Sequence, residues 1–427
     1  MKAIEVEQSM NLKGTVKIPG SKNSSLALLA AACLTDEQVR LTGIPEIADY
    51  HIIRQIADDI GVHMFREETN DVYIDPRAIH STTIDPSRAS KIRTAYYFVG
   101  ALLAKYGKVV IGYPGGDDFV SRPIDQHIKA LTAMGARFTF HKDYYEVEVR
   151  ELRGADIYFD MITSGATINS LLAAVRANGR TILRNAAKDP EVVDTANLLN
   201  QMGAKIKGAG TDTIHIEGVT YLHGCSYTVI PDRLIAGALL MTAGATGGTI
   251  TVEDIIPEHL GSCIAKLEEI GLSFEYGDNS ITAYSSGILK ATRVRTAMYP
   301  GFATDLQQPL TALLTKAGGK SIVTDTIYPK RFSHAGQLIR LGADIRVRSG
   351  TAFVKGGLPL RGNLVHATDI RAGICLLMGG LMAEGRTSIT GVEHFERGYE
   401  NIVDTFCSLG AKIEVSDLPD KEIEFGA

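Results

Sequence analysis

The sequence predicts an α/β fold in which six copies of one unit are divided between two domains. The chain has 427 residues, more than one hydrophobic core usually holds. A pair of adjacent leucines recurs along the chain, beginning at Leu28-Leu29 and ending at Leu376-Leu377. A glycine that ends a predicted helix follows the same period, at intervals of 68 to 74 residues: Gly61, Gly135, Gly203, Gly271, Gly342 and Gly410. Self-similarity at a fixed period is typical of repeated structural units.

The third copy shows the order of the elements within one unit. Residues 169–179 (NSLLAAVRANG) predict an apolar helix that Gly179 ends, and residues 180–185 (RTILRN) predict a short strand. Residues 189–204 (DPEVVDTANLLNQMGA) predict an amphipathic helix with acids in its first turn. Residues 205–210 and 212–218 alternate between polar and apolar side chains like two strands. With a strand before the first helix, each unit is predicted to run strand, helix, strand, helix, strand, strand.

The six units are expected to form two groups of three, because one unit cannot bury both faces of its helices alone. The first predicted domain covers residues 22–229 and includes the glycine-rich loop near residues 112–123. The second covers residues 1–21 plus 230–427, so the N-terminal strand crosses over to complete it. A cleft between the two domains is the default place for a binding site.

Composition excludes several classes of function. The net charge of −5 speaks against a nucleic-acid-binding protein driven by bulk charge. There is no apolar run long enough to cross a membrane and no signal peptide, so a cytoplasmic protein without membrane contact is expected. The sequence lacks GxxxxGK[ST], HExxH and a GxGxxG that follows a strand. No heptad pattern is present, and a monomer is expected. The scattered cysteines show no metal-binding spacing and are expected to be reduced and mostly buried: Cys33, Cys225, Cys263, Cys375 and Cys407.

Two cations lie at predicted helix starts in the first domain. Lys22 and Asn23 follow Pro-Gly-Ser at the opening of an apolar helix, and Arg122 precedes Pro123 at the start of another. A cation there opposes the helix dipole unless an anion binds at the same place. The alternatives are a solvated lysine at a hinge and a surface arginine paired with a nearby aspartate.

A second group of charged residues belongs to the second domain. Asp305 precedes an apolar helix, where it could cap the helix or act as a general base that points into the cleft. Guanidinium groups suit carboxylates and phosphates, which they bind through two parallel hydrogen bonds. We expect the charged residues of this domain to face Lys22, Arg93 and Arg122 across the cleft, although each could instead form a structural salt bridge. They are Arg331, Asp369, Arg371 and Arg397.

Nine motifs in this order resemble the enolpyruvyl transferase family over nearly the whole chain. They are PGSKN, PGG-x5-RP-x-D, SGAT, AAKDPEVVDTANLL, IPDR, ATD-x-Q, KRFSH, ATDIRAG and ERGYE. The resemblance implies a two-domain inside-out α/β barrel with three βαβαββ units in each domain and the helices inside. It also implies transfer of the enolpyruvyl group of phosphoenolpyruvate to a hydroxyl, with release of phosphate and without a metal or cofactor. The branch that uses UDP-N-acetylglucosamine, for peptidoglycan synthesis, is the most similar.

The resemblance also implies the site residues. Asp305 would accept the proton of the 3′-hydroxyl of the sugar, and Asp117, Lys22 and Arg397 would join it in catalysis. The residues expected to bind phosphoenolpyruvate are Lys22, Asn23, Arg122, Arg331, Asp369, Arg371 and Arg397. Those expected to bind UDP-N-acetylglucosamine are Asn23, Arg93, Arg122, Pro123, Ile124, Asp125, Thr163, Ser164, Gly165, Asp305 and Ile327.

Asp117 lies in the stretch 112-GYPGGDDF-119, at a position where most members of this branch carry a cysteine that fosfomycin alkylates. A carboxyl group can donate a proton if a water-poor site raises its pKa, but it is a poor nucleophile towards an epoxide. We therefore expect an active, fosfomycin-resistant enzyme, the alternative being that Asp117 only forms a turn.

Two departures concern the acceptor. Met161 stands where many relatives have a lysine, and the turn 163–167 differs modestly from the usual pattern. They leave open an enzyme that acts on another nucleotide or nucleotide sugar. A separate alternative is a catalytically silent homologue that binds ligands, against which the retained charged residues speak: Lys22, Asp305, Arg331, Asp369, Arg371 and Arg397.

Overall fold

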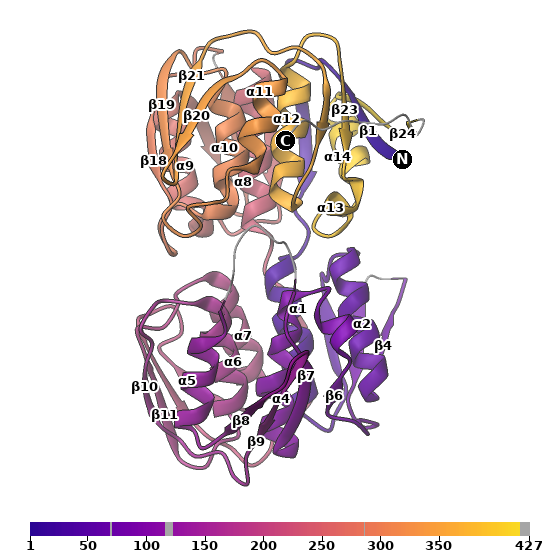
Figure 1. Ribbon diagram of the computed structural model, residues 1–427, viewed down its shortest axis with the longest axis vertical. Helices are drawn as coiled ribbons and strands as arrows, with labels where there is room; N and C mark the ends of the chain where they lie inside the picture. Colours follow the sequence, from indigo (N-terminus) through magenta and orange to yellow (C-terminus); the bar gives the residue numbers. More distant parts are fainter. Residues whose placement is uncertain (69–70, 116–122, 286, 419–427) are drawn as a thin grey trace. The chain divides into compact units, whose positions relative to one another are not determined.

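The computed structural model describes residues 1–68, 71–115, 123–285 and 287–418. The chain folds as two compact units, one formed by Pro19–Pro231 and the other by Met1–Ile18 together with Asp232–Ala427. The sequence analysis placed the domain boundaries at 22–229 and at 1–21 plus 230–427. Each unit is built from three copies of a βαβαββ motif (Figure 1).

The unit Pro19–Pro231 begins with the inner helix α1 (Lys22–Ala31) and ends with the edge strand β14 (Ser226–Thr228). Its first copy continues with β3 (Val39–Thr42), α2 (Ala48–Ile60), β4 (His63–Arg66) and β5 (Asp71–Asp75). The second copy contains β6 (Thr83–Ile84), α4 (Tyr97–Tyr106), β7 (Lys108–Gly112), α5 (Asp125–Ala133), β8 (Arg137–Phe140) and β9 (Tyr144–Glu148). The third contains β10 (Asp156–Tyr158), α6 (Ser164–Ala174), β11 (Arg180–Arg184), α7 (Pro190–Gln201), β12 (Lys205–Lys207) and β13 (Thr213–Glu217).

The other unit starts with two strands from the N-terminus, β1 (Lys2–Glu7) and β2 (Lys13–Lys17). Its first copy adds α8 (Arg233–Thr246), β15 (Thr249–Glu253), α9 (Gly261–Ile270), β16 (Leu272–Tyr276) and β17 (Ser280–Ser285). The second contains β18 (Arg293–Arg295), α10 (Gln307–Leu314), β19 (Gly319–Thr324), α11 (Ser333–Arg340), β20 (Asp344–Arg348) and β21 (Thr351–Gly356). The third contains β22 (Leu364–His366), α12 (Ile370–Met382), β23 (Arg386–Thr390), α13 (Val392–Glu396), α14 (Ile402–Ser408) and β24 (Lys412–Asp417).

All six copies form a four-stranded sheet with the same pattern of one parallel pair followed by two antiparallel pairs. In the sheet β18-β19-β21-β20, for example, β18 and β19 are parallel, while β21 is antiparallel to β19 and to β20. Strands from distant parts of the chain complete three sheets: β2 pairs with β15, β14 with β3, and β1 lies between β23 and β24.

The helices form the core of each unit. The first helix of every copy is apolar on all sides, as expected for a helix surrounded by protein, and all but one residue of α1 and of α8 is buried. Within their units α4 packs against α1 and α6, and α12 packs against α8 and α10. The repeated leucine pairs lie in these inner helices and are at most 2% exposed. The prediction of an inside-out α/β fold with six repeated units is therefore confirmed.

The glycines that mark the repeat have a backbone reason. Gly61 ends α2 with a φ of +94°, and the other five marker glycines have φ values between +93° and +114°. Only glycine adopts this left-handed conformation without steric cost, and it lets the chain leave a helix for the next strand. The periodic glycine is thus a direct consequence of the repeated helix-to-strand turn.

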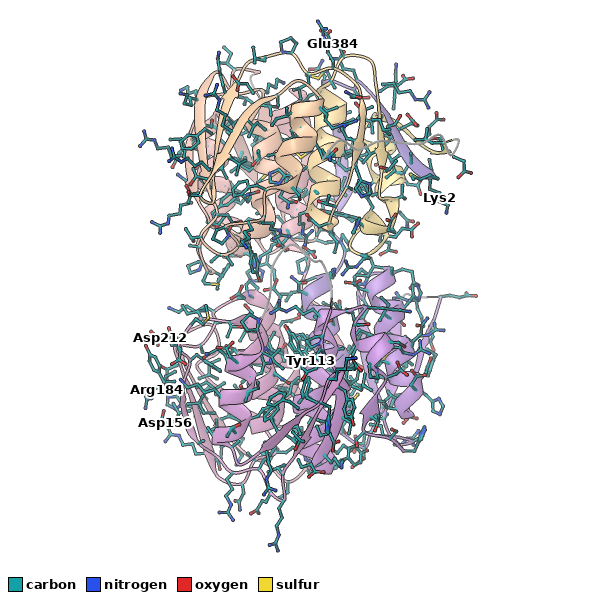
Figure 2. The ribbon with its side chains drawn as sticks, in the orientation of Figure 1. Lys2, Tyr113, Asp156, Arg184, Asp212 and Glu384 are labelled. Carbon is teal, nitrogen blue, oxygen red and sulfur yellow. The ribbon has the colours of Figure 1, made fainter. Side chains whose placement is uncertain are left out.

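The outward faces of the sheets carry the polar side chains, as Asp156 and Arg184 illustrate (Figure 2). No helix in the described part of the chain is long and apolar enough to span a membrane. The five cysteines are free; Cys33, Cys263 and Cys375 are buried and Cys407 is exposed.

Candidate active site

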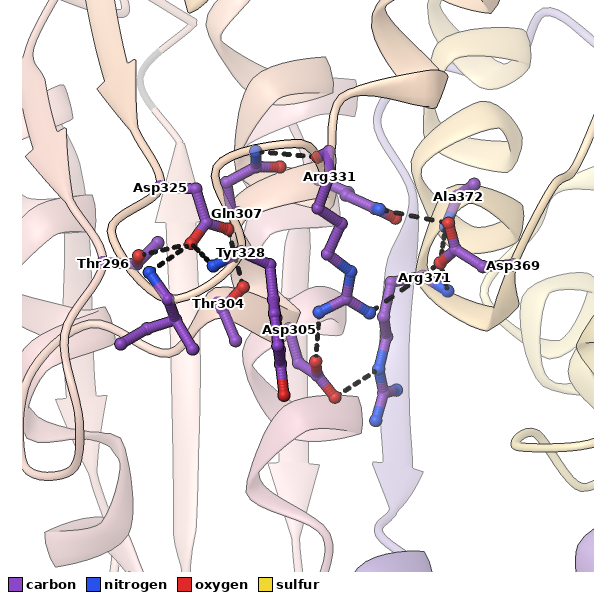
Figure 3. A network of polar contacts seen from close by, with 12 residues as sticks. Thr296, Thr304, Asp305, Gln307, Asp325, Tyr328, Arg331, Asp369, Arg371 and Ala372 are labelled. Carbon is purple, nitrogen blue, oxygen red and sulfur yellow. Dashed lines mark hydrogen bonds and ion pairs between the residues drawn. The ribbon is translucent and has the colours of Figure 1, made fainter. Parts of the chain in front are cut away.

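The carboxylate of Asp305 lies between two guanidinium groups (Figure 3). Arg331 Nη1 donates a hydrogen bond to Oδ1 at 2.5 Å, and Arg371 Nε donates one to Oδ2 at 3.1 Å. The three residues come from different elements: the 3-10 turn before α10, the loop before α11 and the first turn of α12. The arginine side chains are 4% and 5% exposed, whereas that of Asp305 is 26% exposed.

Asp305 is held in its ionised form. Burial by itself would raise the pKa of this carboxyl group, but Arg331 and then Arg371 outweigh it and hold the pKa well below the ordinary value. Against the effect of burial, Asp305 raises the pKa of Arg331, and Tyr399 and then Asp305 raise the pKa of Arg371. The interpretation of Asp305 as a helix cap is wrong, because the turn Thr304–Leu306 has no side-chain cap and the carboxylate is bound to the arginines instead.

Asp369 fixes the start of α12. Its Oδ1 accepts hydrogen bonds from the backbone N–H groups of Arg371 at 2.9 Å and of Ala372 at 3.1 Å, as an N-cap does. The amide of Gln308 donates to its other oxygen at 3.2 Å, and Arg331 Nη2 lies 3.8 Å from Oδ1. Asp369 therefore positions both the backbone of Arg371 and the guanidinium group of Arg331.

Tyr399 and His334 lie close to the same arginines. Arg371 Nη1 donates a hydrogen bond of 3.1 Å to the hydroxyl of Tyr399. His334 is fully buried, and neither ring nitrogen has a hydrogen-bond partner among the described residues. Burial and the nearby Arg331 lower the pKa of His334 to about 3. The imidazole is therefore neutral at pH 7.

Asp325 is the centre of a second cluster, which adjoins the first through Thr304 (Figure 3). Oδ1 accepts hydrogen bonds from the hydroxyl of Thr296 at 2.8 Å and from the backbone N–H groups of Ile327 and Tyr328 at 2.9 Å each. Oδ2 accepts one from the hydroxyl of Thr304 at 2.6 Å. This single carboxylate, 1% exposed, joins the turn that carries Ile327 to the residue that precedes Asp305.

In the other unit, Lys22 is the first residue of α1 and forms an ion pair with Asp49. Its Nζ lies 2.6 Å from Oδ2 of Asp49, which is in the first turn of α2, and the two side chains are 10% and 2% exposed. A lysine at this helix start opposes the helix dipole unless an anion lies nearby. In this structure a carboxylate of the protein itself supplies the negative charge.

Four of the residues expected to bind the sugar nucleotide lie around the start of α6: Arg93, Thr163, Ser164 and Gly165. Arg93 lies over the ring of Tyr96, with its Cζ 5.7 Å from the ring centroid, and its Nη1 is buried without a hydrogen-bond partner among the described residues. Thr163 caps α6, whose first residues are Ser164 and Gly165. A Cβ at Gly165 would come within 2.4 Å of the Tyr96 hydroxyl, so this close approach requires glycine.

His127 links Tyr96 to α6. Its ring contacts that of Tyr96 at a centroid distance of 4.5 Å, and its Nδ1 lies 3.1 Å from Nδ2 of Asn169. Burial and Arg93 lower the pKa of His127 to about 3. It therefore acts as a neutral packing group at physiological pH.

The remaining predicted residues are placed separately. Asn23 is half-buried in the first turn of α1, and Arg397 is half-buried directly after α13. Asp117 and Arg122 lie outside the described residues. Pro123 and Asp125 are exposed, with Ile124 between them half-buried, and Met161 is 57% exposed. Among the residues that the structure describes, no group of His, Cys, Asp and Glu could hold a metal ion.

Sequence reasoning missed four residues that hold these groups in place. Asp49 and Asp325 gave no signal beyond their type, since Lys22, the partner of Asp49, and the two hydroxyl donors to Asp325 lie elsewhere in the chain. Tyr399 lies within the motif ERGYE, and Gln308 directly follows the motif ATD-x-Q. A search for polar residues flanking those motifs could have found them.

The sequence of this chain is similar to proteins of one known family. Residues 6–406 match the family model of EPSP synthase (3-phosphoshikimate 1-carboxyvinyltransferase). A protein of Geobacillus kaustophilus named UDP-N-acetylglucosamine 1-carboxyvinyltransferase 2 is 48% identical over 97% of this chain and 96% of its own length. Proteins of the same name from Bacillus anthracis and Listeria monocytogenes are each 46% identical, over 99% and 98% of this chain and 99% of their own lengths.

Solved structures agree on the fold. The enolpyruvyl transferase NikO from Streptomyces tendae superimposes with a TM-score of 0.90 at 24% identity, covering 98% of this chain and 99% of its own. EPSP synthase from Acinetobacter baumannii gives a TM-score of 0.75 at 20% identity, covering 98% of this chain and all of its own. The repeated βαβαββ fold, the motifs and these matches over nearly the full length show that the chain belongs to the EPSP synthase family of enolpyruvyl transferases.

Proposed function

We propose that this protein transfers the enolpyruvyl group of phosphoenolpyruvate to the 3′-hydroxyl of UDP-N-acetylglucosamine and releases phosphate. The observation that carries the proposal is the pair of buried arginines that converge on the partly exposed carboxylate of Asp305. Phosphoenolpyruvate brings a carboxylate and a phosphate, the two groups that guanidinium forks bind best. The names of the relatives that are 46% to 48% identical support the choice of acceptor.

The ion pairs suggest how Asp305 becomes a base. A carboxylate that two arginines neutralise is a weak proton acceptor, because its pKa is far below that of a useful general base. When the anionic groups of phosphoenolpyruvate engage Arg331 and Arg371, the arginines hold Asp305 less tightly and its pKa rises. Asp305 then accepts the proton of the sugar hydroxyl as its oxygen attacks. Binding of phosphoenolpyruvate would therefore also activate Asp305 as the base.

The proposed reaction is an addition followed by an elimination. The 3′-oxygen attacks C2 of phosphoenolpyruvate while C3 takes up a proton, which gives a tetrahedral adduct. Loss of a proton from C3 and cleavage of the bond between C2 and the phosphate oxygen then yield the enolpyruvyl ether and phosphate. Arg331, Arg371 and Arg397 would stabilise the negative charge that develops on the leaving phosphate.

We further propose that Asp117 gives the proton to C3 in place of a cysteine. Its position in the sequence 114-PGGDD-118 supports this role, and exclusion of water would raise its pKa into the range of a proton donor. Because a carboxylate is a poor nucleophile, fosfomycin should not inactivate the enzyme. The test incubates the wild type and the variant Asp117→Cys with fosfomycin and follows the activity of each over time. Time-dependent, irreversible loss of activity in the wild type would refute this part of the proposal.

The experiment for the reaction is phosphate release from phosphoenolpyruvate, measured with and without UDP-N-acetylglucosamine. Release that depends on the sugar nucleotide establishes the reaction and the acceptor. The exposed Met161 favours a second candidate, in which the acceptor is another nucleotide or UDP-sugar; release with UMP or another UDP-sugar alone would support it. No release with any acceptor would indicate a silent homologue.

A further inference from the structure

One sheet of the molecule carries six exposed cations on its outward face. In β18, β19, β20 and β21 the residues alternate, so that Val294, Val323, Ile345 and Val354 are buried while their neighbours point outwards. All six cations at outward positions are exposed. We call this surface the basic sheet face, defined by Arg293, Arg295, Lys320, Arg346, Arg348 and Lys355.

The strand register arranges the arginines at the two edges. Two successive rows across the sheet read Arg293–Ile322–Phe353–Arg346 and Arg295–Thr324–Thr351–Arg348. The outer strands are therefore about 14 Å apart, three strand spacings. Each row has an arginine at both ends and uncharged side chains between them. The basic sheet face is thus a shallow strip flanked by cations.

The cations of this face are not neutralised within the described part of the protein. None of the six forms an ion pair there, and Asp344, opposite Lys355 in the register, is the one acid on the face. In four other sheets of the same architecture at least one outward cation pairs with a carboxylate, as Arg184 and Asp156 do at 2.8 Å (Figure 2). The other three pairs are Arg40–Asp71, Lys108–Glu148 and Arg386–Glu5. Since the whole chain has a net charge of −5, this concentration of positive charge is local.

We propose that the basic sheet face binds an extended, acidic segment of a partner protein. Arginines two residues apart on a strand are about 6.6 Å apart, the same spacing as acids at alternate positions of an extended peptide. A guanidinium fork can bind each carboxylate through two hydrogen bonds. Phe353, which is 36% exposed, and the half-buried Ile322 would contact one apolar side chain of that segment. The inference does not depend on the proposed reaction.

Two other anionic partners fit less well. Single-stranded nucleic acid is usually held by several stacking aromatic side chains, whereas this face offers one. An acidic membrane would gain from exposed apolar side chains that insert into the lipid, and Phe353 is the one exposed apolar side chain at the outward positions of these strands. The acidic overall charge of the chain also repels a long polyanion more than a short peptide.

The test is fluorescence anisotropy with a labelled short peptide of alternating glutamate and serine, titrated with the full-length protein. Four substitutions remove the charges at the edges: Arg293→Gln, Arg295→Gln, Arg346→Gln and Arg348→Gln. A matched control removes the same charge from exposed cations of other sheets, by Lys13→Gln, Lys17→Gln, Arg137→Gln and Lys412→Gln. Exposed ion pairs are individually weak, but four together should weaken binding at least about tenfold.

The expected result is loss of peptide binding in the edge variant and less than about a twofold change in the control, with equal thermal stability for both. An equal loss in both variants would show that net charge alone attracts the peptide and would overturn the proposal, as would no binding by the wild type. Tighter, face-dependent binding of oligothymidylate, or of vesicles made from equal parts of phosphatidylcholine and phosphatidylglycerol, would overturn the choice of an acidic protein segment.

Discussion

Replacement of Asp325 tests how the site is held together. In Asp325→Ala the hydroxyl of Thr296, which is fully buried, loses its acceptor without access to water, at a cost of about 2 kcal/mol. The donors of Thr304, Ile327 and Tyr328 are half-buried and should each cost about 1 kcal/mol. The expected loss of unfolding free energy is therefore about 5 kcal/mol.

Asp325→Asn should be much milder. Three of the four hydrogen bonds converge on Oδ1, and an amide oxygen at that position keeps them while losing the charge. The amide nitrogen would then replace Oδ2, and the hydroxyl of Thr304 can turn to accept from it. Loss of charge assistance on three bonds should cost about 1.5 kcal/mol.

The assay is urea unfolding followed by circular dichroism, with Thr251→Val as the control. Thr251 shares a hydrogen bond of 2.8 Å with Thr282 on a half-buried part of another sheet in the same unit, and its replacement should cost less than about 1 kcal/mol. If Asp325→Ala stays within about 1 kcal/mol of the wild type, the reasoning that this carboxylate organises the site is refuted. Provided that the proposed reaction holds, Asp325→Asn should also raise KM for UDP-N-acetylglucosamine more than it lowers kcat, because Ile327 lies in the turn that it fixes.

Three further predictions concern charged groups. Arg371→Lys keeps the charge but cannot contact both Asp305 and Tyr399, so kcat/KM for phosphate release should fall by about 10²-fold with little change in Tm; unchanged kinetics would contradict the proposed role. In the folded protein His334 has a pKa of about 3, below its ordinary value. As the pH falls from about 6.5 towards 3, the unfolded chain binds a proton at this histidine that the folded protein does not bind. The contribution of neutral His334 to stability is therefore complete above about pH 6.5 and is lost towards pH 3. Between pH 6.5 and 5 the loss is about 2 kcal/mol, and His334→Leu should remove that part of the pH dependence in urea unfolding. Asp49→Asn leaves the Lys22 ammonium buried without its carboxylate and should cost about 3 kcal/mol, and the double variant with Lys22→Met should recover most of the loss; an additive double variant would show that the two charges are not coupled.

The fold could be predicted largely because its signals are local and repeated. The left-handed turn after each outer helix requires glycine, so Gly61 and its five counterparts mark every copy. The leucine pairs mark the inner helices because a helix surrounded by protein must be apolar on all sides. In the third copy the predicted strand at residues 180–185 and the predicted helix at 189–204 correspond to β11 and α7, while α6 begins at Ser164, earlier than the apolar pattern alone indicates.

The candidate site could be predicted only in part. The motifs identified Asp305, Arg331 and Arg371 individually, and the structure brings the three together. Asp325 escaped prediction because two of its four donors, the hydroxyls of Thr296 and Thr304, lie more than 20 residues before it in the chain, and the sequence around an aspartate does not reveal such distant partners. The N-cap reading of Asp305 failed for a related reason, since a helix start offers local N–H groups whereas two distant arginines offer a stronger, charged interaction.

The sequence by itself determined the elements, their sixfold repetition and the family, because helix ends, hydrophobic periods and motifs depend on residues close together in the chain. Only the tertiary structure decided which charges neutralise one another. Lys22 meets Asp49 because two helix starts lie side by side, and β1 lies between β23 and β24 although most of the chain separates them. Electrostatic energy depends on distance in space, and the folding of the chain sets those distances between residues that are far apart in the sequence.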